Sequence, residues 1–192
     1  MHLQIPVDVY KNIPFESIEK WIENRIDCLK NFAIDNHQLP PLIIYLYKKN
    51  NEINEKIVHL EHIINNPTAK NILSEIIPQR LKEDQSFVCI SCFEAWLRNE
   101  KTFEIMDEVL IFNCEQLSEE KNIIQTLHIF KVNRSGGEFS LEKYLGKSLS
   151  THRRFSNFLK KEIDLNPNYI CFEIENPPPD STKRSNDENL EN

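Results

Sequence analysis

Three apolar runs follow one another in the middle of the chain, and they constrain the fold more than any other feature. They are FVCISCFEAWL (residues 87–97), EVLIFNC (residues 108–114) and IIQTLHIFKV (residues 123–132). Each run is rich in β-branched and aromatic residues, is too short for an ordinary helix and is followed by a polar connection. We therefore expect three neighbouring antiparallel strands at the centre of one sheet.

The region before these runs carries the strongest helical pattern in the chain. Apolar residues recur at three- and four-residue spacing over residues 15–32, with charged and polar residues between them. Asn12 or Ser17 suits the N-cap, because a short polar side chain there accepts a hydrogen bond from a backbone N–H of the first turn. We expect this helix to end near residues 35–37, because the proline pair at 40–41 disfavours helical backbone before it.

A hairpin and a second helix are expected between that helix and the three central runs. Residues 42–48 and 53–60 have the composition of strands and flank the asparagine pair at 50–51. Asparagine tolerates the positive φ angles of tight turns, so these two segments predict a β-hairpin. Residues 68–82 show helical spacing of apolar residues, and Pro78 predicts a break or kink in the last part of this helix.

Two further strands are expected beside these elements. Residues 3–10 predict an extended arm at a sheet edge, because Pro6 lacks the N–H that a ladder requires. After the third central run, the glycine pair at 136–137 predicts a turn. Residues 138–144 are then a fourth strand of the meander.

The C-terminal part predicts one more helix and strand before a polar tail. The helix is expected over residues 152–163 and the strand over residues 168–174. Residues 176–192 contain three consecutive prolines and no apolar periodicity, so we expect this tail to be disordered. We therefore expect one α+β domain over residues 1–175. Its sheet should be mostly antiparallel, a hairpin plus a meander, covered by two to three helices on one face.

Charge and cysteine content restrict the class of protein. The 192-residue chain has a formal net charge of −7 and a pI near 5.4. This argues against a dedicated nucleic-acid binder, which needs a concentrated basic face to neutralise phosphates. The five cysteines are an odd number set mostly in apolar surroundings, as in reduced proteins. No signal peptide is evident and no apolar run approaches the ~18 residues that span a bilayer, so we expect a cytoplasmic protein without membrane contact.

A short pattern in the first two central runs resembles a group of known proteins. The first run contains Glu-Ala-Trp at residues 94–96, and Asp107 and Glu108 open the next strand. In this the chain resembles small uncharacterised bacterial and phage proteins in which a proline-led hairpin and a helix precede a strand ending in Glu-Ala-Trp. The resemblance covers about residues 40–140. It implies the α+β fold and a bacterial or phage source, and it implies no activity and no catalytic residue.

Two close pairs of residues are of types that bind zinc. Cys89 and Cys92 form Cys-x-x-Cys, and His59 and His62 form His-x-x-His. Structural zinc sites hold such a cysteine pair in a turn, whereas residues three apart in an extended strand point to opposite faces. The pattern therefore favours core thiols over a metal site, and we expect neither a metal nor another cofactor.

Two carboxylates interrupt or open the apolar strands and are candidates for chemistry. Glu94 lies near the end of the first run and Glu108 opens the second, so adjacent antiparallel strands can bring them close. Paired carboxylates bind divalent cations or share acid and base roles, and His128 on the third run is the candidate base beside them. The alternative, which these positions favour, is that each is an ordinary side chain on a solvated or packed strand face.

A basic segment near the C-terminus contrasts with the acidic chain. It includes Arg153, Arg154 and Lys160, and the two arginines lie at the start of a predicted helix, where they oppose the helix dipole. Such side chains can bind a phosphate group or an acidic surface of a partner. A solvated helix face is the alternative, and the composition favours it.

The function expected from these features is a small soluble non-enzymatic interaction protein, an adaptor, inhibitor or effector that contacts a protein partner. The sequence contains no glycine-rich phosphate loop and no Gly-x-Ser-x-Gly elbow. The alternative is a metal-dependent or acid-base enzyme that uses Glu94, Glu108 and His128. The oligomeric state is left open.

Overall fold

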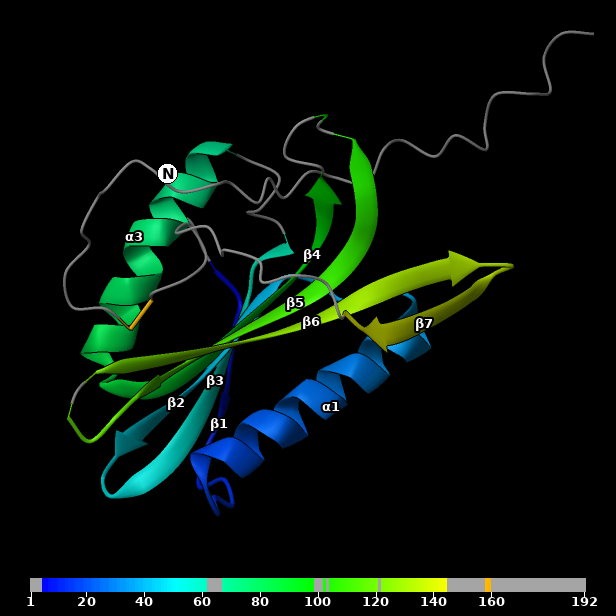
Figure 1. The fold of residues 1–192 in the computed structure, drawn as a ribbon. Helices are drawn as coiled ribbons and strands as arrows, with labels where there is room; N and C mark the ends of the chain where they lie inside the picture. The colour runs from blue at the N-terminus through cyan, green and yellow to red at the C-terminus, as the bar shows by residue number, and fades with distance from the viewer. Residues whose placement is uncertain are drawn as a thin grey trace, which may run out of the picture.

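The computed structural model describes residues 5–61, 67–98, 102, 104–120, 122–144 and 158–159, with backbone alone for residues 67–74. Its elements, in chain order, are β1 (Val7–Tyr10), α1 (Ile18–Asn36), β2 (Leu42–Lys49), β3 (Glu52–His59), α3 (Pro67–Glu83), β4 (Ser86–Arg98), β5 (Ile105–Leu117), β6 (Ile123–Ser135) and β7 (Glu138–Lys143) (Figure 1). The expected helix over residues 152–163, the strand over residues 168–174 and the tail lie outside the described residues, apart from residues 158–159.

The strands form one seven-stranded sheet in the order β1-β3-β2-β4-β5-β6-β7. Every pairing between the described strands is antiparallel, which confirms an antiparallel sheet built from a hairpin and a meander. β1 and β7 are the two edges. The position of β1 agrees with the expectation that Pro6 confines this segment to an edge.

Local chemistry accounts for the ends of the elements. The Ser17 hydroxyl accepts a hydrogen bond from the backbone N–H of Lys20 at 3.2 Å, and α1 ends at Asn36, followed by His37 as the C-cap with a φ of 57°. This confirms the predicted start and end of the first helix. Asn50 and Asn51 turn the β2–β3 hairpin with φ angles of 53° and 64°, as the sequence predicts.

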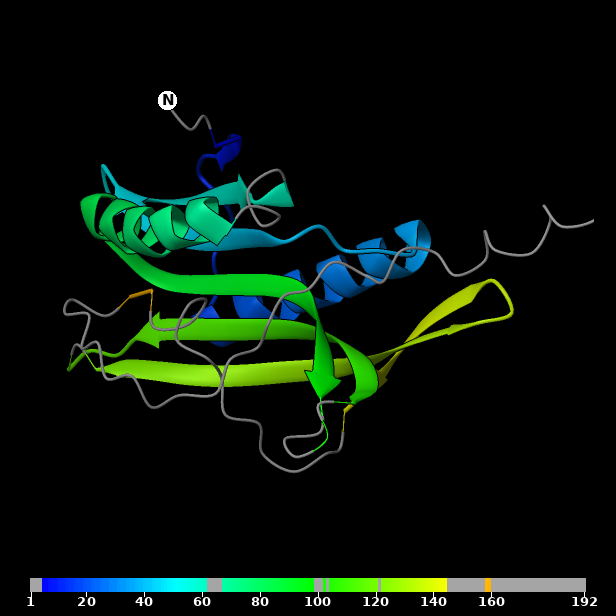
Figure 2. The same ribbon diagram turned by 90° about the horizontal axis from the view of Figure 1, so that it is seen from above.

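The two described helices, α1 and α3, lie on opposite faces of the sheet, so the expected covering of one face is wrong (Figures 1 and 2). Ile22 and Ile26 of α1 pack in one cluster with Ile90 and Cys92 of β4. A second cluster, on the other face, contains Ile77 and Leu81 of α3 and Cys89 of β4; its remaining buried members are Ile43, Tyr45, Tyr47, Val58, Leu60 and Phe158. The physical reason lies in β4, whose even-numbered and odd-numbered residues are both apolar. A strand with this pattern is buried on both faces, because successive side chains point to opposite sides.

We refer to these as the α1 face and the α3 face. On β4, even-numbered residues such as Val88 and Ile90 face α1, and odd-numbered residues such as Cys89 face α3. A third cluster, Phe93, Ala95, Leu97, Val109 and Ile111, lies further along the odd-numbered positions of β4 and β5. α3 itself continues through Pro78 to Glu83, so the proline does not end the helix.

Candidate functional site

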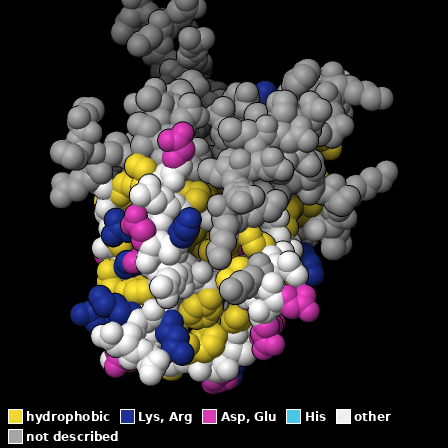
Figure 3. Space-filling view, turned by 90° about the vertical axis from the view of Figure 1, so that its left-hand side faces the viewer, with side chains coloured by type: hydrophobic (Ala, Val, Ile, Leu, Met, Phe, Trp, Pro, Cys, Tyr) yellow, Lys and Arg dark blue, Asp and Glu magenta, His cyan; other side chains and the backbone are white. Residues whose placement is uncertain are grey.

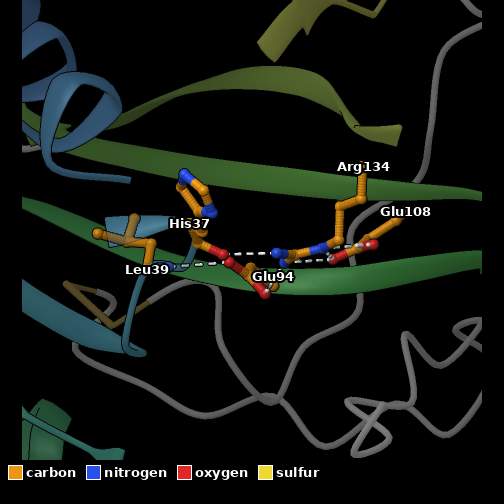
Figure 4. Close-up of polar contacts among 5 residues, drawn as sticks. All are labelled: His37, Leu39, Glu94, Glu108 and Arg134. Carbon is orange, nitrogen blue, oxygen red and sulfur yellow. Dashed lines mark hydrogen bonds and ion pairs between the residues drawn. The ribbon is translucent and has the colours of Figure 1, made fainter. Parts of the chain in front are cut away.

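One arginine joins the two carboxylates that the sequence singles out. Arg134 near the end of β6 donates to Glu108 of β5 from Nε, at 3.0 and 3.1 Å, and from Nη2 at 2.8 Å. The same Nη2 donates to Glu94 of β4 at 3.2 Å (Figure 4). Glu94 and Glu108 are therefore neighbours across two strands, and a guanidinium lies between them and balances part of their charge.

The end of α1 completes this group, which we call the Arg134 clamp and define as Arg134, Glu94, Glu108, His37 and Leu39 (Figure 4). The Nη1 of Arg134 donates to the backbone oxygen of His37. The backbone N–H of Leu39 donates to Glu94 Oε1 at 2.9 Å. The clamp thus fastens the turn after α1 to three central strands and places a cation at the negative end of the helix dipole.

Strand parity brings these groups together. Glu94 and Glu108 occupy even-numbered positions on antiparallel strands, and Leu110, which pairs with Glu94, belongs to the cluster on the α1 face. Arg134 pairs with Phe139 of β7, and its guanidinium lies 4.8 Å from the centre of that ring. The arginine is therefore held by a cation–π contact as well as by ion pairs.

Burial and hydrogen bonding shift the pKa values of two groups of the clamp. Burial raises the pKa of Glu94, and the nearby charge of Glu108 acts in the same direction, while the Leu39 N–H and Arg134 oppose it. Hydrogen bonding to Glu108 raises the pKa of Arg134. Glu94 faces the chain after α1 and is half-buried there, with 27% of its side chain exposed.

His128 is on the α1 face but apart from the clamp. It pairs with Phe112, whereas Glu94 pairs with Leu110 and Leu110 in turn pairs with Phe130. Burial lowers the pKa of His128, Lys143 adds to this and Glu23 of α1 opposes it. Neither clamp carboxylate contributes to that shift, so the structure brings together two of the three candidate catalytic residues and leaves the histidine out.

The candidate zinc ligands are not assembled in the described part of the chain. Cys89 packs on the α3 face and Cys92 on the α1 face. His59 Nε2 lies 2.8 Å from the carboxylate of Asp8, and His62 is outside the described residues. Within the described ranges, three or more His, Cys, Asp and Glu side chains nowhere form a group that could hold a metal ion.

The buried thiols have the chemistry of core residues. Burial raises the pKa values of Cys89 and Cys92, and it raises that of Cys114 to about 12. A thiol must ionise to act as a nucleophile or metal ligand, and the raised pKa values keep these three thiols protonated at neutral pH. The basic candidates Arg153, Arg154 and Lys160 lie outside the described residues.

A buried carboxylate on the α3 face, Glu115, is not among the candidates selected from the sequence. Glu115 of β5 is fully buried; it accepts a hydrogen bond from the Asn113 side chain at 3.0 Å and one from the backbone N–H of Leu159, also at 3.0 Å. Phe158, beside Leu159, is buried in the cluster on the α3 face. Glu115 therefore holds a C-terminal segment on the sheet. The available signal was a carboxylate at the end of an apolar strand, the same signal that selected Glu94.

Two further carboxylates connect helices to the sheet. Glu55 of β3 accepts from the indole of Trp21 at 2.9 Å and from Arg25 at 2.7 Å, which ties α1 to the α1 face. On the α3 face, Asp84 accepts from Tyr45 at 2.6 Å and from Lys56 at 2.5 Å. Neither carboxylate is predicted from the sequence, because partners 28 to 39 residues apart leave no local spacing signal.

The described residues on one side of the molecule form a surface of mixed charge. On the side that Figure 3 shows, Lys and Arg side chains alternate with Asp and Glu side chains and with hydrophobic ones, and no continuous basic region is visible among the coloured residues. Within the described ranges no helix is long and apolar enough to cross a membrane.

Apolar side chains are exposed at one sheet edge. Val9 and Tyr10, neighbours on β1, are 47% and 50% exposed. The other edge strand, β7, buries Phe139 beside Arg134 and His37 and exposes Glu138 and Glu142. Of the two edges, β1 is the one with apolar groups available for contact.

Comparison of the chain with models of protein families, with curated proteins and with solved structures gave no match.

Proposed function

We propose that this chain is a non-enzymatic interaction protein that binds a protein partner at β1. The observation that carries the proposal is the pair of exposed apolar side chains, Val9 and Tyr10, on a strand at the edge of the sheet. Val9 lies on one face of β1 and Tyr10 on the other, so a segment that binds along this edge finds an apolar group on each face, and tyrosine is enriched at binding surfaces. Strand edges themselves are a common site of protein recognition.

The condition of the candidate catalytic residues supports the same proposal. The guanidinium of Arg134 hydrogen-bonds to both Glu94 and Glu108, and the Leu39 N–H occupies another oxygen of Glu94. Carboxylates engaged in this way act as structural acceptors that join α1 to the sheet.

The test replaces the exposed side chains and keeps the strand. The variant Val9→Thr with Tyr10→Thr retains β propensity and removes the apolar contact area. Proteins bound by wild-type and variant chains are compared by quantitative mass spectrometry after capture from a lysate of the source organism, and the affinity of each captured protein is then measured with purified components. We expect at least one direct partner whose affinity falls by about tenfold or more in the variant.

A matched control uses the exposed apolar pair at the start of β5. Ile105 and Met106 are 47% and 58% exposed, so Ile105→Thr with Met106→Thr removes a similar apolar area elsewhere. Its affinity for the partner should equal that of the wild type. If purified proteins show no direct partner, or if both double variants lose affinity equally, the proposal is wrong.

An alternative function is supported by one observation, the raised pKa of Glu94 beside Glu108. A carboxylate with a raised pKa near a second carboxylate is suited to acid-base work or cation binding. For a metal-dependent or acid-base enzyme using Glu94, Glu108 and His128, Mn²⁺ or Mg²⁺ should raise the melting temperature of the wild type and not of Glu94→Gln. Equal melting temperatures with and without the cations would count against it.

A further inference from the structure

We infer that the partner supplies an extended segment that adds to the sheet as an eighth strand beside β1, and that this segment alternates apolar and basic residues. The inference rests on the function proposed above and names the class of partner. Its basis is the direction of the backbone groups of β1, the exposure of its side chains and the charge of the chain.

The backbone of β1 is directed alternately towards β3 and away from it. The N–H of His59 donates to the carbonyl oxygen of Pro6 at 3.1 Å, so residue 6 faces β3. In an antiparallel pair the N–H and C=O of one residue point to the same side, and the sides alternate along the strand. Asp8 and Tyr10 therefore face β3 as well, and the N–H and C=O groups of Val7 and Val9 point outward.

These outward groups repeat at the spacing of a strand. Val7 and Val9 are two residues apart, or about 6.6 Å, which is the spacing at which a neighbouring antiparallel strand exchanges hydrogen bonds. In the part of the chain that the structure describes, β3 is the one strand that pairs with β1. An extended backbone satisfies such a row of donors and acceptors, whereas the backbone of a helix bonds to itself.

The edge is held in place before any partner arrives. Val7 packs against the cluster on the α3 face, as does Ile5. Asp8 Oδ2 lies 2.8 Å from His59 Nε2 on the opposite face. A strand already ordered by such contacts loses little further conformational freedom when a second strand adds to it.

The other sheet edge is less suited to the addition of a strand. β7 exposes Glu138 and Glu142, and charged side chains on an edge strand oppose pairing with other chains. β1 presents Val9 and Tyr10 instead. The contrast assigns strand addition to β1.

Side chains and charge indicate the composition of the added strand. Val7 and Val9 lie on one face of β1, so apolar residues suit the positions opposite them. On the other face the Asp8 carboxylate is 56% exposed and Tyr10 is its neighbour, which together suit a lysine or arginine. The net charge of −7 also favours a basic partner and opposes a second copy of this chain.

The experiment selects peptides and asks whether they bind as strands. Twelve-residue peptides displayed as a random library are selected against the full chain, and the peptides obtained are measured against two proline variants. Val9→Pro removes an outward N–H without disturbing a bond to β3, since proline is tolerated at an edge position of this kind. Lys143→Pro is the matched control, because the N–H of Tyr144 donates to Ile129, which directs the N–H of Lys143 away from β6 at the other edge.

We expect selected peptides that alternate apolar with basic residues, bind the wild type and Lys143→Pro equally and bind Val9→Pro at least about tenfold more weakly. N-methylation of single peptide residues should weaken binding at every second position and leave the positions between unaffected, because only alternate N–H groups face β1. Selection of no binding peptide, equal binding to Val9→Pro, an N-methylation profile without this period or peptides without basic residues would each overturn the inference.

Analytical ultracentrifugation tests whether a second copy of this chain, and not a different partner, binds at the β1 edge. A wild type that dimerises while Val9→Pro is monomeric would assign the edge to a second copy and overturn the inference. The proposed function fails separately. A direct partner that is lost in the Val9→Thr, Tyr10→Thr variant and retained by Val9→Pro would preserve the interaction function and reject strand addition.

Discussion

Arg134 and Glu94 lie 40 residues apart in the sequence, and the Nη2 of the arginine donates to the carboxylate at 3.2 Å. The contact joins β6 to β4 across β5, whose Glu108 receives three hydrogen bonds from the same guanidinium. It explains how a partly buried pair of carboxylates coexists in one place. It also makes Arg134 the cation that the two carboxylates share.

Loss of that arginine should destabilise the fold measurably. Arg134→Ala leaves Glu94 and Glu108 close together without a cation, and removes the donor to the His37 carbonyl. We expect the free energy of unfolding to fall by ~1–3 kcal/mol, measured by urea denaturation at neutral pH. Lys131→Ala is the matched control, because Lys131 is 42% exposed against 41% for Arg134 and forms one ion pair, with Asp107. An equally large loss in the control would mean that the clamp has no special role.

The ionisation of Glu94 should make stability fall as pH rises. Burial raises the pKa of Glu94 above its usual 4.5, so the folded state binds this proton more tightly than the unfolded state. The resulting stabilisation is fully present below the unfolded pKa and is lost as pH rises through the folded pKa. The unfolding free energy of the wild type relative to Glu94→Gln should therefore decrease across this window. A difference that increases with pH there would contradict the pKa direction.

Asp84 should contribute a dependence of the opposite sign. Burial alone would raise its pKa, but hydrogen bonds from Lys56 and Tyr45 outweigh burial and lower it below 3.8. Its contribution to stability is present above the unfolded pKa and is lost as pH falls through the folded pKa. Tyr45→Phe, which removes the 2.6 Å hydrogen bond, should reduce the unfolding free energy by ~1 kcal/mol at neutral pH and less in acid. A loss that stays constant with pH would show that the hydroxyl acts independently of the carboxylate.

Glu115 should control the attachment of the segment around Leu159. Glu115→Ala removes the acceptor for the Leu159 N–H and for the Asn113 amide, whereas Glu115→Gln retains an acceptor oxygen. We expect faster hydrogen exchange at Leu159 in the alanine variant than in the glutamine variant, measured by mass spectrometry on peptides covering Phe158. Unchanged exchange in both variants would show that the apolar contact of Phe158 is sufficient to hold the segment.

The thiols should divide into accessible and protected groups. Among the described cysteines, Cys28 is exposed and Cys89, Cys92 and Cys114 are buried. In a chain carrying Cys28→Ser and Cys171→Ser, a thiol reagent should react only at the rate of unfolding, because burial both blocks access and raises the thiol pKa. Rapid labelling of the folded variant would contradict the burial of these side chains.

The sequence by itself determined the order and type of the described elements. Ser17 and the asparagine pair at 50–51 act on backbone a few residues away, so their consequences follow from local chemistry. β4 is apolar at even-numbered and at odd-numbered positions, and this pattern indicates a strand covered on both faces. The expectation of helices on one face did not take this pattern into account.

The tertiary structure alone decided which polar groups meet. Arg134 reaches Glu94 and Glu108, Leu159 reaches Glu115 and Trp21 reaches Glu55 across separations of 26 to 44 residues. Such meetings depend on strand order and register, since a shift of one residue moves every side chain to the other face. That is why Glu94 and Glu108 could be selected as candidates from the sequence, while the arginine that joins them and the exclusion of His128 followed only from the folded chain.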